Sequence, residues 1–502
     1  MPGKKQRHSR PGFPIEIWAL IFEKLGEYIP DHVKWFSREP ESRPSQLRAI
    51  QRLRRVCRTF SSLASPLLCP YLYLEISYES IDRAKELLKN PRIASGIRGI
   101  QLSLAYRPEI LAHSRSEFSS HWEAKLEDAY SELKLELKPE SKPWSWEDDP
   151  DLYEKFVAKE RQKKMLSTLR NFAQYLGPAN SRSGYEFFRS SHERYKEKHY
   201  EQFELLMNGS FVRQLAAALG RVRHPIALHL TDDVQQRYNM KNYRLFLGDT
   251  GLADAFIQPM PLSDIKGGLL PARVLTELPI AISQAGGWLQ SLKLSCPINR
   301  CCYIFPPGAS PERSMMELRD AFKFLRVVGV GRLGYWCMYT SALLSSRSLR
   351  HVAIGCGELQ HIGTNCNRPI CQRGRQTARW FRTVEPTVKR FRIEDVTISH
   401  TELEQMLHML SPRCKEIRIA SVRLFYGDWL KIVEILRLKA GSRIANGKCM
   451  LHFTALSGGG FPQRPWDYLY DELEEQLAEY DWKVKQVLDY IAGKHVDKWW
   501  SE

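Results

Sequence analysis

Two short runs near the start of the chain place hydrophobic side chains at helical spacing. The first run follows Pro14, which suits the first turn of a helix because that turn needs no N–H donor. Three- and four-residue steps then give one apolar stripe in each run. The stripes comprise Ile17, Trp18, Ile21, Phe22 and Leu25 in the first run, and Leu53, Val56, Cys57, Phe60 and Leu63 in the second. Helices this apolar predict burial against the rest of the chain or against a partner.

A strand, a helix and a strand recur along the chain after residue 70. Leu74 and Ile100 lie 26 residues apart, as do Ile393 and Ile419, and a leucine-rich repeat spans roughly 20–29 residues. This spacing favours an irregular leucine-rich-repeat-like solenoid, and a non-repetitive α/β domain with a partly parallel sheet is the alternative. The predicted segments are strands at 71–76, 98–104, 289–296, 349–356, 388–398 and 414–424, and helices at 80–89 and 401–410.

Helical patterns interrupt and end this array. Residues 107–222 carry several apolar stripes around a proline- and acid-rich break, which predicts a long helical insertion. Residues 465–492 alternate steps of four and three, which predicts one helix with acidic residues in its first turns. Such a helix would cap the last apolar edge of a solenoid. Self-association through a short coiled coil is the alternative.

The order and spacing of the first two runs resemble an F-box, the short helical module that docks a protein onto the Skp adaptor of a cullin-based ubiquitin ligase. The motif departs from the family at Phe13, where Leu is usual, and in the segment 26–47, where the family has only a few residues. We interpret this segment as a loop insertion, because the entropy cost of closing a loop grows slowly with length. A helical hairpin packed on its own core is the alternative. The resemblance rests on Phe13-Pro14-Ile15-Glu16-Ile17, Ile21-Phe22, Leu25 and Leu53-x-x-Val56-Cys57-x-x-Phe60-x-x-Leu63.

The resemblance is to a fungal-type F-box protein, in which degenerate leucine-rich repeats follow the F-box. It implies a substrate-recognition adaptor of an SCF ligase that binds the Skp adaptor and cullin, acts as a monomer within the complex and is not itself an enzyme. The repeat-like region would bind a protein substrate that the sequence does not identify. An interaction scaffold without ubiquitin transfer is the alternative. The residues implied to contact the Skp adaptor are Pro14, Ile17, Trp18, Ile21, Phe22, Leu25, Leu53, Val56, Cys57, Phe60 and Leu63.

The expected fold class is α/β, with a helical F-box, a solenoid, a helical insertion and a helical cap. The expected segments are a basic disordered tail (1–12), the F-box (13–70) with its loop insertion (26–47), the first repeat-like units (71–106), the helical insertion (107–222), the irregular repeat-like region (223–464) and the C-terminal capping helix (465–502).

Composition is that of a globular protein with a large positive charge. Of 502 residues, 43% are hydrophobic, and 74 basic against 57 acidic residues give a net charge of +17. The basic residues are dispersed apart from runs such as 4–7, 52–58 and 161–164, and no aromatic platform interleaves with them, so we expect no dedicated nucleic-acid site. Eleven cysteines without framework spacing, and the lack of a signal-peptide core or a membrane-spanning apolar run, predict a cytoplasmic or nuclear protein with reduced thiols.

One glycine motif has the order of a dinucleotide-binding unit. Gly329, Gly331 and Gly334 form a G-x-G-x-x-G after a strand-like run, and Glu358 stands further on, where such units hold the ribose. No second mononucleotide half follows. A nucleotide-binding enzyme is therefore only a minor alternative.

Two further motifs fall short of the chemistry that they suggest. Residues 441–449 miss the spacing of a phosphate loop and end in Cys449, where a Mg²⁺-binding Ser or Thr is required. A set of possible zinc ligands lacks the short Cys-x-x-Cys typical of structural sites. We therefore expect neither metal nor cofactor. The set comprises Cys356, His361, Cys366 and Cys371.

Overall fold

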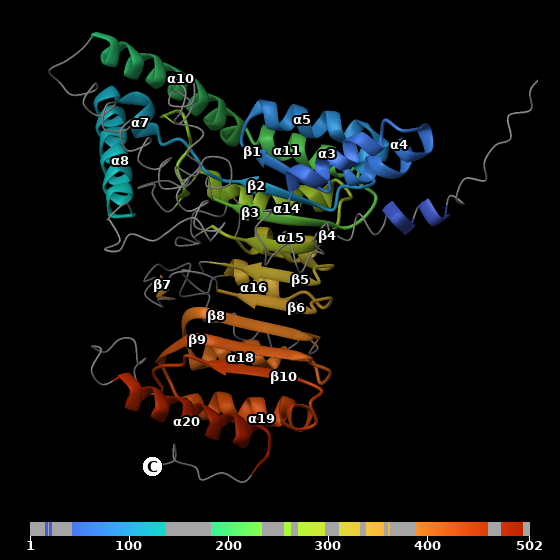
Figure 1. Ribbon diagram of the computed structural model, residues 1–502, viewed down its shortest axis with the longest axis vertical. Coiled ribbons are helices and arrows are strands. Elements are labelled where there is room, and N and C mark those ends of the chain that lie inside the picture. Colours follow the sequence, from blue (N-terminus) through green and yellow to red (C-terminus); the bar gives the residue numbers. More distant parts are fainter. Residues whose placement is uncertain are drawn as a thin grey trace, which may run out of the picture.

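The central feature of the fold is one large sheet in which all strands run parallel (Figure 1). The computed structural model describes residues 16–18, 20–22, 43–136, 182–232, 256–262, 270–296, 311–331, 338–355, 360–361, 387–459 and 473–494. The predicted α/β class is confirmed, and the sheet is mostly parallel. The strands are β1 (Tyr71–Glu75), β2 (Gly99–Ser103), β3 (Ile226–Thr231), β4 (Leu289–Leu294), β5 (Val327–Val330), β6 (His351–Ile354), β7 (Gln360–His361), β8 (Arg390–Ser399), β9 (Glu416–Tyr426) and β10 (Met450–Thr454).

The strands lie in chain order across the sheet, β1-β2-β3-β4-β5-β6-β8-β9-β10, and the short β7 pairs with β8 off this path. Each of the nine strands on this path contributes one buried residue to an apolar row that crosses the sheet. Alternate residues of a strand point to the same face, and the residues of this row point towards the helices. The row comprises Leu74, Leu102, Leu230, Leu294, Val330, Ile354, Ile393, Ile419 and Phe453.

This register corrects one of the two repeat lengths expected from the sequence. Ile393 pairs with Ile419, as the 26-residue spacing predicts. Leu74 pairs with Leu102 rather than with Ile100, so the first unit spans 28 residues. The extra length accommodates the short helix α6 (Pro91–Ala94), which precedes β2.

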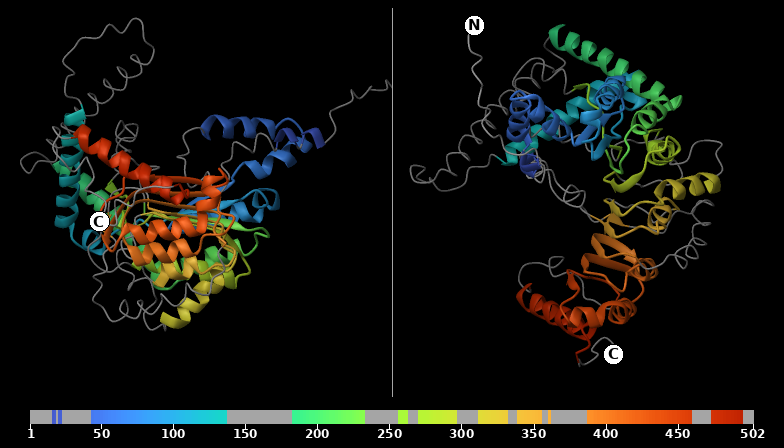
Figure 2. Two further views of the ribbon diagram at one scale, coloured as in Figure 1. Left: turned by 90° about the horizontal axis from the view of Figure 1, so that it is seen from below. Right: turned by 90° about the vertical axis from the view of Figure 1, so that its right-hand side faces the viewer.

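The helices form a row along one face of the sheet (Figures 1 and 2). Consecutive members contact one another from α5 to α16, and α18 contacts α19. Their apolar sides meet the sheet in a single continuous core. Burial of this apolar face is the main stabilising contribution. The row comprises α5 (Tyr78–Lys89), α11 (Ser210–Leu219), α14 (Val274–Gln284), α15 (Pro311–Phe322), α16 (Met338–Leu344), α18 (His400–His408) and α19 (Trp429–Ala445).

One backbone conformation repeats in neighbouring strands. Asp395, Ser421 and Ala455 all adopt a positive φ of 52–53°, which is uncommon for residues other than glycine. The registers of β8, β9 and β10 place these residues on one rung, two positions after the buried apolar row. The last three units therefore share one local kink.

Helix α14 contains a proline whose missing hydrogen bond is replaced by a side chain from the next but one helix. Pro279 has no N–H to donate to the carbonyl of Leu275, four residues earlier. The buried hydroxyl of Tyr339 in α16 donates to that carbonyl at 2.9 Å. The hydroxyl thus satisfies an acceptor that would otherwise be buried without a partner.

We predict that Tyr339→Phe lowers the free energy of unfolding by about 1–3 kcal/mol, because it leaves the Leu275 carbonyl buried and unpaired. The control is the same substitution in a Pro279→Ala background, where the new N–H reaches that carbonyl. The cost of Tyr339→Phe should shrink there, as measured by a double-mutant cycle of thermal unfolding. An equal cost in both backgrounds would refute this account.

The predicted helical insertion lies beyond the edge at which the strands end. Helices α7 (Glu109–His113), α8 (Arg115–Glu136) and α10 (Arg182–Met207) pack together there. The side-chain oxygen of Gln202 in α10 accepts from the backbone N–H of Arg107 at 3.1 Å, which fixes the cluster to the chain that leaves β2. Helix α11 falls inside the expected range 107–222 but belongs to the row of helices, between α5 and α14.

The last helix, α20 (Leu473–Ile491), packs on α19 and β10 at the end of the sheet. Val487 and Ile491 are buried, and the guanidinium of Arg437 in α19 lies 4.2 Å from the Tyr490 ring centre. Helix α20 therefore covers the last strand of the described sheet, and residues 465–472 of the expected helix lie outside the described residues. Among the described helices, none combines the length and hydropathy that a membrane crossing needs.

Candidate partner-binding surfaces

The first candidate surface is the N-terminal module, defined as the described residues from 16 to 70. It contains a helical segment at 16–22, α3 (Arg43–Leu53), α4 (Arg58–Ala64) and the 3₁₀ turn η1 (Ser65–Leu67). The sequence suggested one helix across 53–63, but the structure breaks it: α3 ends at Leu53, and Cys57 caps α4 by accepting from Phe60 N–H at 3.4 Å. Helix α3 also begins at Arg43, inside the expected loop 26–47, with Pro44 in its first turn.

The module has a small core of its own, separate from that of the sheet. The Phe60 ring lies at its centre, with ring centres 4.5 Å from Trp18 and 5.4 Å from Phe22 in edge-to-face contact. Phe22, Ile50 and Ala64 are buried. The partly buried residues packed against them are Leu53, Phe60, Leu63, Leu67 and Leu68.

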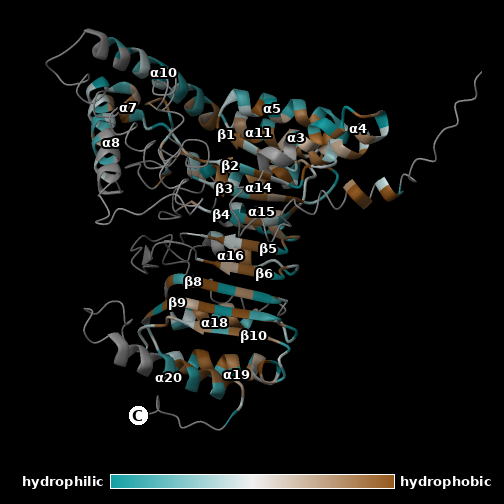
Figure 3. Ribbon diagram, viewed as in Figure 1, coloured by the Kyte–Doolittle hydropathy of each residue, from teal (hydrophilic) through white to brown (hydrophobic). Residues whose placement is uncertain are grey.

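Other apolar residues of the module remain exposed to solvent. Ile17, Leu20 and Ile21 are 39%, 55% and 41% exposed, and Val56 is 64% exposed. Residues 17, 20 and 21 share one helical face, next to the face that carries Trp18 and Phe22. The apolar surface of this helix is therefore too wide for Phe60 alone to cover, and residues 20–22 are the brown segment near the grey N-terminal trace in Figure 3.

The described residues that are implied to contact an adaptor divide into an exposed group and a group that packs inside the module. The exposed group comprises Ile17, Ile21, Val56 and Cys57. Pro14 and Leu25 lie outside the described residues. Leu20 also belongs to the exposed group, although the F-box resemblance does not include it. Its spacing of three residues from Ile17 places it on the same helical face. The residues that contribute instead to the module's own packing are Trp18, Phe22, Leu53, Phe60 and Leu63.

The module joins the sheet through a close backbone contact. Turn η1 packs on α6, and a Cβ on Gly96 would lie 1.8 Å from the carbonyl oxygen of Pro66. No side chain fits between these two backbones. Gly96 therefore allows the module to sit directly against the first unit of the array.

The second candidate surface is the sheet face opposite the helices. Its central row changes character along the sheet: Tyr73, Gln101 and His229 are buried or half-buried, whereas Arg392, Arg418 and His452 are half-exposed or exposed. Apart from Gly329 and Ala353, the residues of this row are polar or charged, in contrast to the apolar row on the other face. In register order the row comprises Tyr73, Gln101, His229, Lys293, Gly329, Ala353, Arg392, Arg418 and His452.

Charges on β8 and β9 pair across the strands. Arg392 contacts Glu416 at 3.2 Å and Glu394 at 3.6 Å, and Arg418 contacts Glu394 at 2.5 Å. Arg390 adds a longer contact to Glu416 at 3.9 Å. Because the arginines are nearly half exposed, these pairs contribute little stability. The two glutamates offset part of the positive charge of the three arginines.

A buried histidine marks the middle of the same face. The Nε2 atom of His229 lies 2.8 Å from Ser295 Oγ at the end of β4. Burial, with the nearby Lys293 ammonium, lowers the pKa of His229 to about 3. The imidazole is therefore neutral at physiological pH and serves as a hydrogen-bond partner.

This shift predicts lower stability in mild acid. The unfolded chain protonates His229 near its ordinary pKa of 6.5, whereas the folded chain does not until about pH 3, so acidification between these values favours unfolding. We expect the melting temperature to fall between pH 7 and pH 5, and to fall less in His229→Gln. His224→Gln is the control, because that ring is only partly buried. An unchanged pH slope in His229→Gln would contradict the assignment.

The glycine motif lies in a topology unlike that of a dinucleotide site. Gly329 is in β5, Gly331 follows it, and α16 comes next, as the motif predicts, while Gly334 and Glu358 lie outside the described residues. Nucleotides bind open parallel sheets where the strand order reverses, and the described strands keep one direction throughout. Of the possible zinc ligands only His361, in β7, is described, and the described residues contain no cluster of three potential metal ligands.

Comparison of this chain with protein-family models, curated proteins and solved structures finds no match.

Proposed function

We propose that this chain is a substrate-recognition subunit of a cullin-type SCF ubiquitin ligase, whose N-terminal module acts as an F-box and binds the Skp adaptor. The observation that supports this proposal is the division of the module's apolar residues. Trp18, Phe22 and Phe60 form a self-contained core, while Ile17 and Val56 remain exposed. Exposed apolar groups on a small helical unit are characteristic of a surface that a partner covers.

The strand–helix array is, in this proposal, a leucine-rich-repeat-like solenoid that holds the substrate. The sequential order of the strands and the repeated kink at Asp395, Ser421 and Ala455 support a repeating unit. The chain would contribute no catalytic side chain. Ubiquitin transfer would follow from proximity, because the assembly holds the substrate near a loaded conjugating enzyme.

The test is co-purification of the full chain with a Skp adaptor and a cullin after co-expression. Wild type should retain both proteins, and Ile17→Asp should lose both together. Failure of the wild type to retain the adaptor would overturn the proposal. Retention of the adaptor without the cullin would instead favour a scaffold without ubiquitin transfer.

A further inference from the structure

The edge of the sheet at which the strands begin carries many basic residues and no acidic residue in its turns. The turns that lead from a helix into a strand are 90–98, 220–225, 285–288, 323–326, 345–350, 409–415 and 446–449, and residues 387–389 lead into β8. None contains Asp or Glu. Their cations are Arg92, Arg98, Arg221, Arg223, Lys323, Arg326, Arg347, Arg350, Lys389, Arg413, Lys415 and Lys448, which we call the basic edge.

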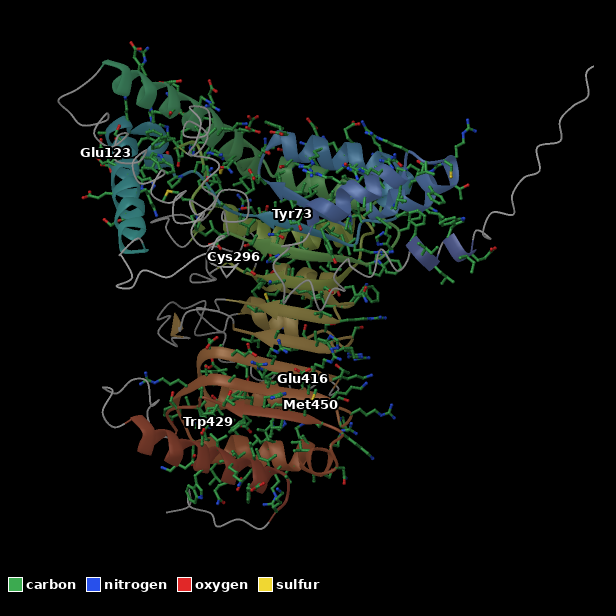
Figure 4. All side chains as sticks on the ribbon, viewed as in Figure 1. Tyr73, Glu123, Cys296, Glu416, Trp429 and Met450 are labelled. Carbon is green, nitrogen blue, oxygen red and sulfur yellow. The ribbon has the colours of Figure 1, made fainter. Side chains whose placement is uncertain are left out.

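The basic edge comes from the topology, because all strands of a parallel sheet start on the same side. In the sequence its residues are scattered over more than 350 positions. Figure 4 shows nitrogen-tipped side chains projecting from this side, near the labelled Glu416 and Met450, which open β9 and β10. The dispersed charge of the sequence is therefore concentrated in space.

Four of these cations stand on consecutive rungs. Backbone N–H groups of Arg350, Lys389 and Lys415 donate to the carbonyls of Arg326, Arg350 and Lys389 at 2.7–2.8 Å. Adjacent strands are about 4.8 Å apart, so these four positive charges repel one another. Within the described residues none of the four forms an ion pair with an acidic side chain, and Arg326, Lys389 and Lys415 are exposed.

Helix capping does not account for this arrangement. The effect of a helix's negative C-terminal end is confined to about its last turn, whereas Arg326, Arg350 and Lys415 follow the ends of α15, α16 and α18 by four, six and seven residues. The turn after α14 contains no cation. In place of a cation, that turn presents Trp288, which is 49% exposed. Its ring centre lies 6.3 Å from that of Phe324, which is 51% exposed and has the Lys323 ammonium 5.1 Å from its ring centre.

We propose that the basic edge is a binding site for an acidic polypeptide segment that carries one apolar side chain, with Trp288 and Phe324 as the apolar anchor. A row of unpaired cations is complementary to a run of carboxylates or phosphates. A single aromatic pair suits one apolar side chain. Single-stranded nucleic acids, in contrast, use aromatic platforms repeated along the strand, and the described edge has only this pair.

As a substrate site, the basic edge rests on the proposed function. Peptide binding is measured without the adaptor, so its result tests the basic edge alone. Co-purification with the adaptor tests the proposed function separately. The probe is a fluorescent peptide of eighteen glutamates around one central leucine. An all-glutamate peptide and a twenty-nucleotide oligothymidylate are compared with it by fluorescence polarisation at about 50 mM salt.

We expect Arg350→Glu combined with Lys389→Glu to weaken peptide binding at least tenfold. The matched control is Lys431→Glu combined with Lys485→Glu, on the exposed sides of α19 and α20, which changes the net charge equally. Trp288→Ala should weaken only the leucine-containing peptide. The milder pair Arg350→Gln and Lys389→Gln, with unchanged thermal unfolding, separates lost binding from lost folding.

Three results would overturn the proposal. The first is no binding of the acidic peptides by wild type. The second is equal weakening by the control pair, which would indicate attraction to net charge alone. The third is tighter binding of the oligonucleotide than of the peptide with the same dependence on Arg350 and Lys389, which would assign the edge to nucleic acid.

Discussion

Val56→Asp is expected to abolish binding of the Skp adaptor while the chain remains folded. Val56 is 64% exposed in the turn between α3 and α4, so a carboxylate there stays hydrated in the free protein. In the proposed complex that carboxylate would be buried without a partner, which costs several kcal/mol. Affinity should fall at least about 100-fold, because each 1.4 kcal/mol is tenfold. Co-purification followed by calorimetric titration measures the loss.

The matched control is Leu438→Asp, since Leu438 is an 86% exposed apolar residue in α19, far along the chain from the module. It should bind the adaptor like wild type. Phe60→Ala provides a different comparison, because Phe60 packs on Trp18 and Phe22 inside the module. Its loss of binding should come with a lower melting temperature, whereas Val56→Asp leaves the melting temperature unchanged. Normal adaptor binding by Val56→Asp would contradict the proposed surface.

Strongly periodic segments could be predicted from the sequence because one face of each is buried. The strands at β1, β2, β4, β6, β8 and β9 and the helices α5 and α18 all lie within their predicted segments or within two residues of them. Strand β3 was not predicted, since every residue of Ile226–Thr231 is buried and the alternation is lost. Helix α14 was missed because Pro279 is a strong signal against a helix, and its compensation by Tyr339 is a tertiary contact.

The candidate surfaces differ in how far the sequence could reveal them. The apolar stripe of the module is local, so its residues were found, but their division into core and exposed residues depends on where Phe60 lies. The basic edge is not local. Arg98 and Lys448 meet the same edge only because every crossover returns the chain to it, so no window of sequence contains the pattern.

Gly355→Ala is expected to be among the most destabilising single-methyl additions in the described chain. Gly355 follows β6 with a φ of +86°, a conformation that costs other residues about 1–2 kcal/mol. A Cβ there would also lie 1.6 Å from the carbonyl oxygen of Glu394 in β8 and 2.6 Å from Val396 Cγ2. The methyl group therefore forces β6 and β8 apart next to Ile354 and Ile393, the paired residues that these strands contribute to the apolar row.

Gly286→Ala separates the two contributions. Gly286 has almost the same φ, +83°, but a Cβ there meets nothing within 4 Å. Its cost should be only the conformational contribution of about 1–2 kcal/mol. Gly355→Ala should cost about 1–3 kcal/mol more, because the added methyl group overpacks the sheet. Thermal unfolding of the two variants measures the difference. Equal losses of stability would mean that β6 and β8 can separate without a free-energy cost. The sheet would then not be rigid enough to hold the cations of the basic edge at fixed spacing.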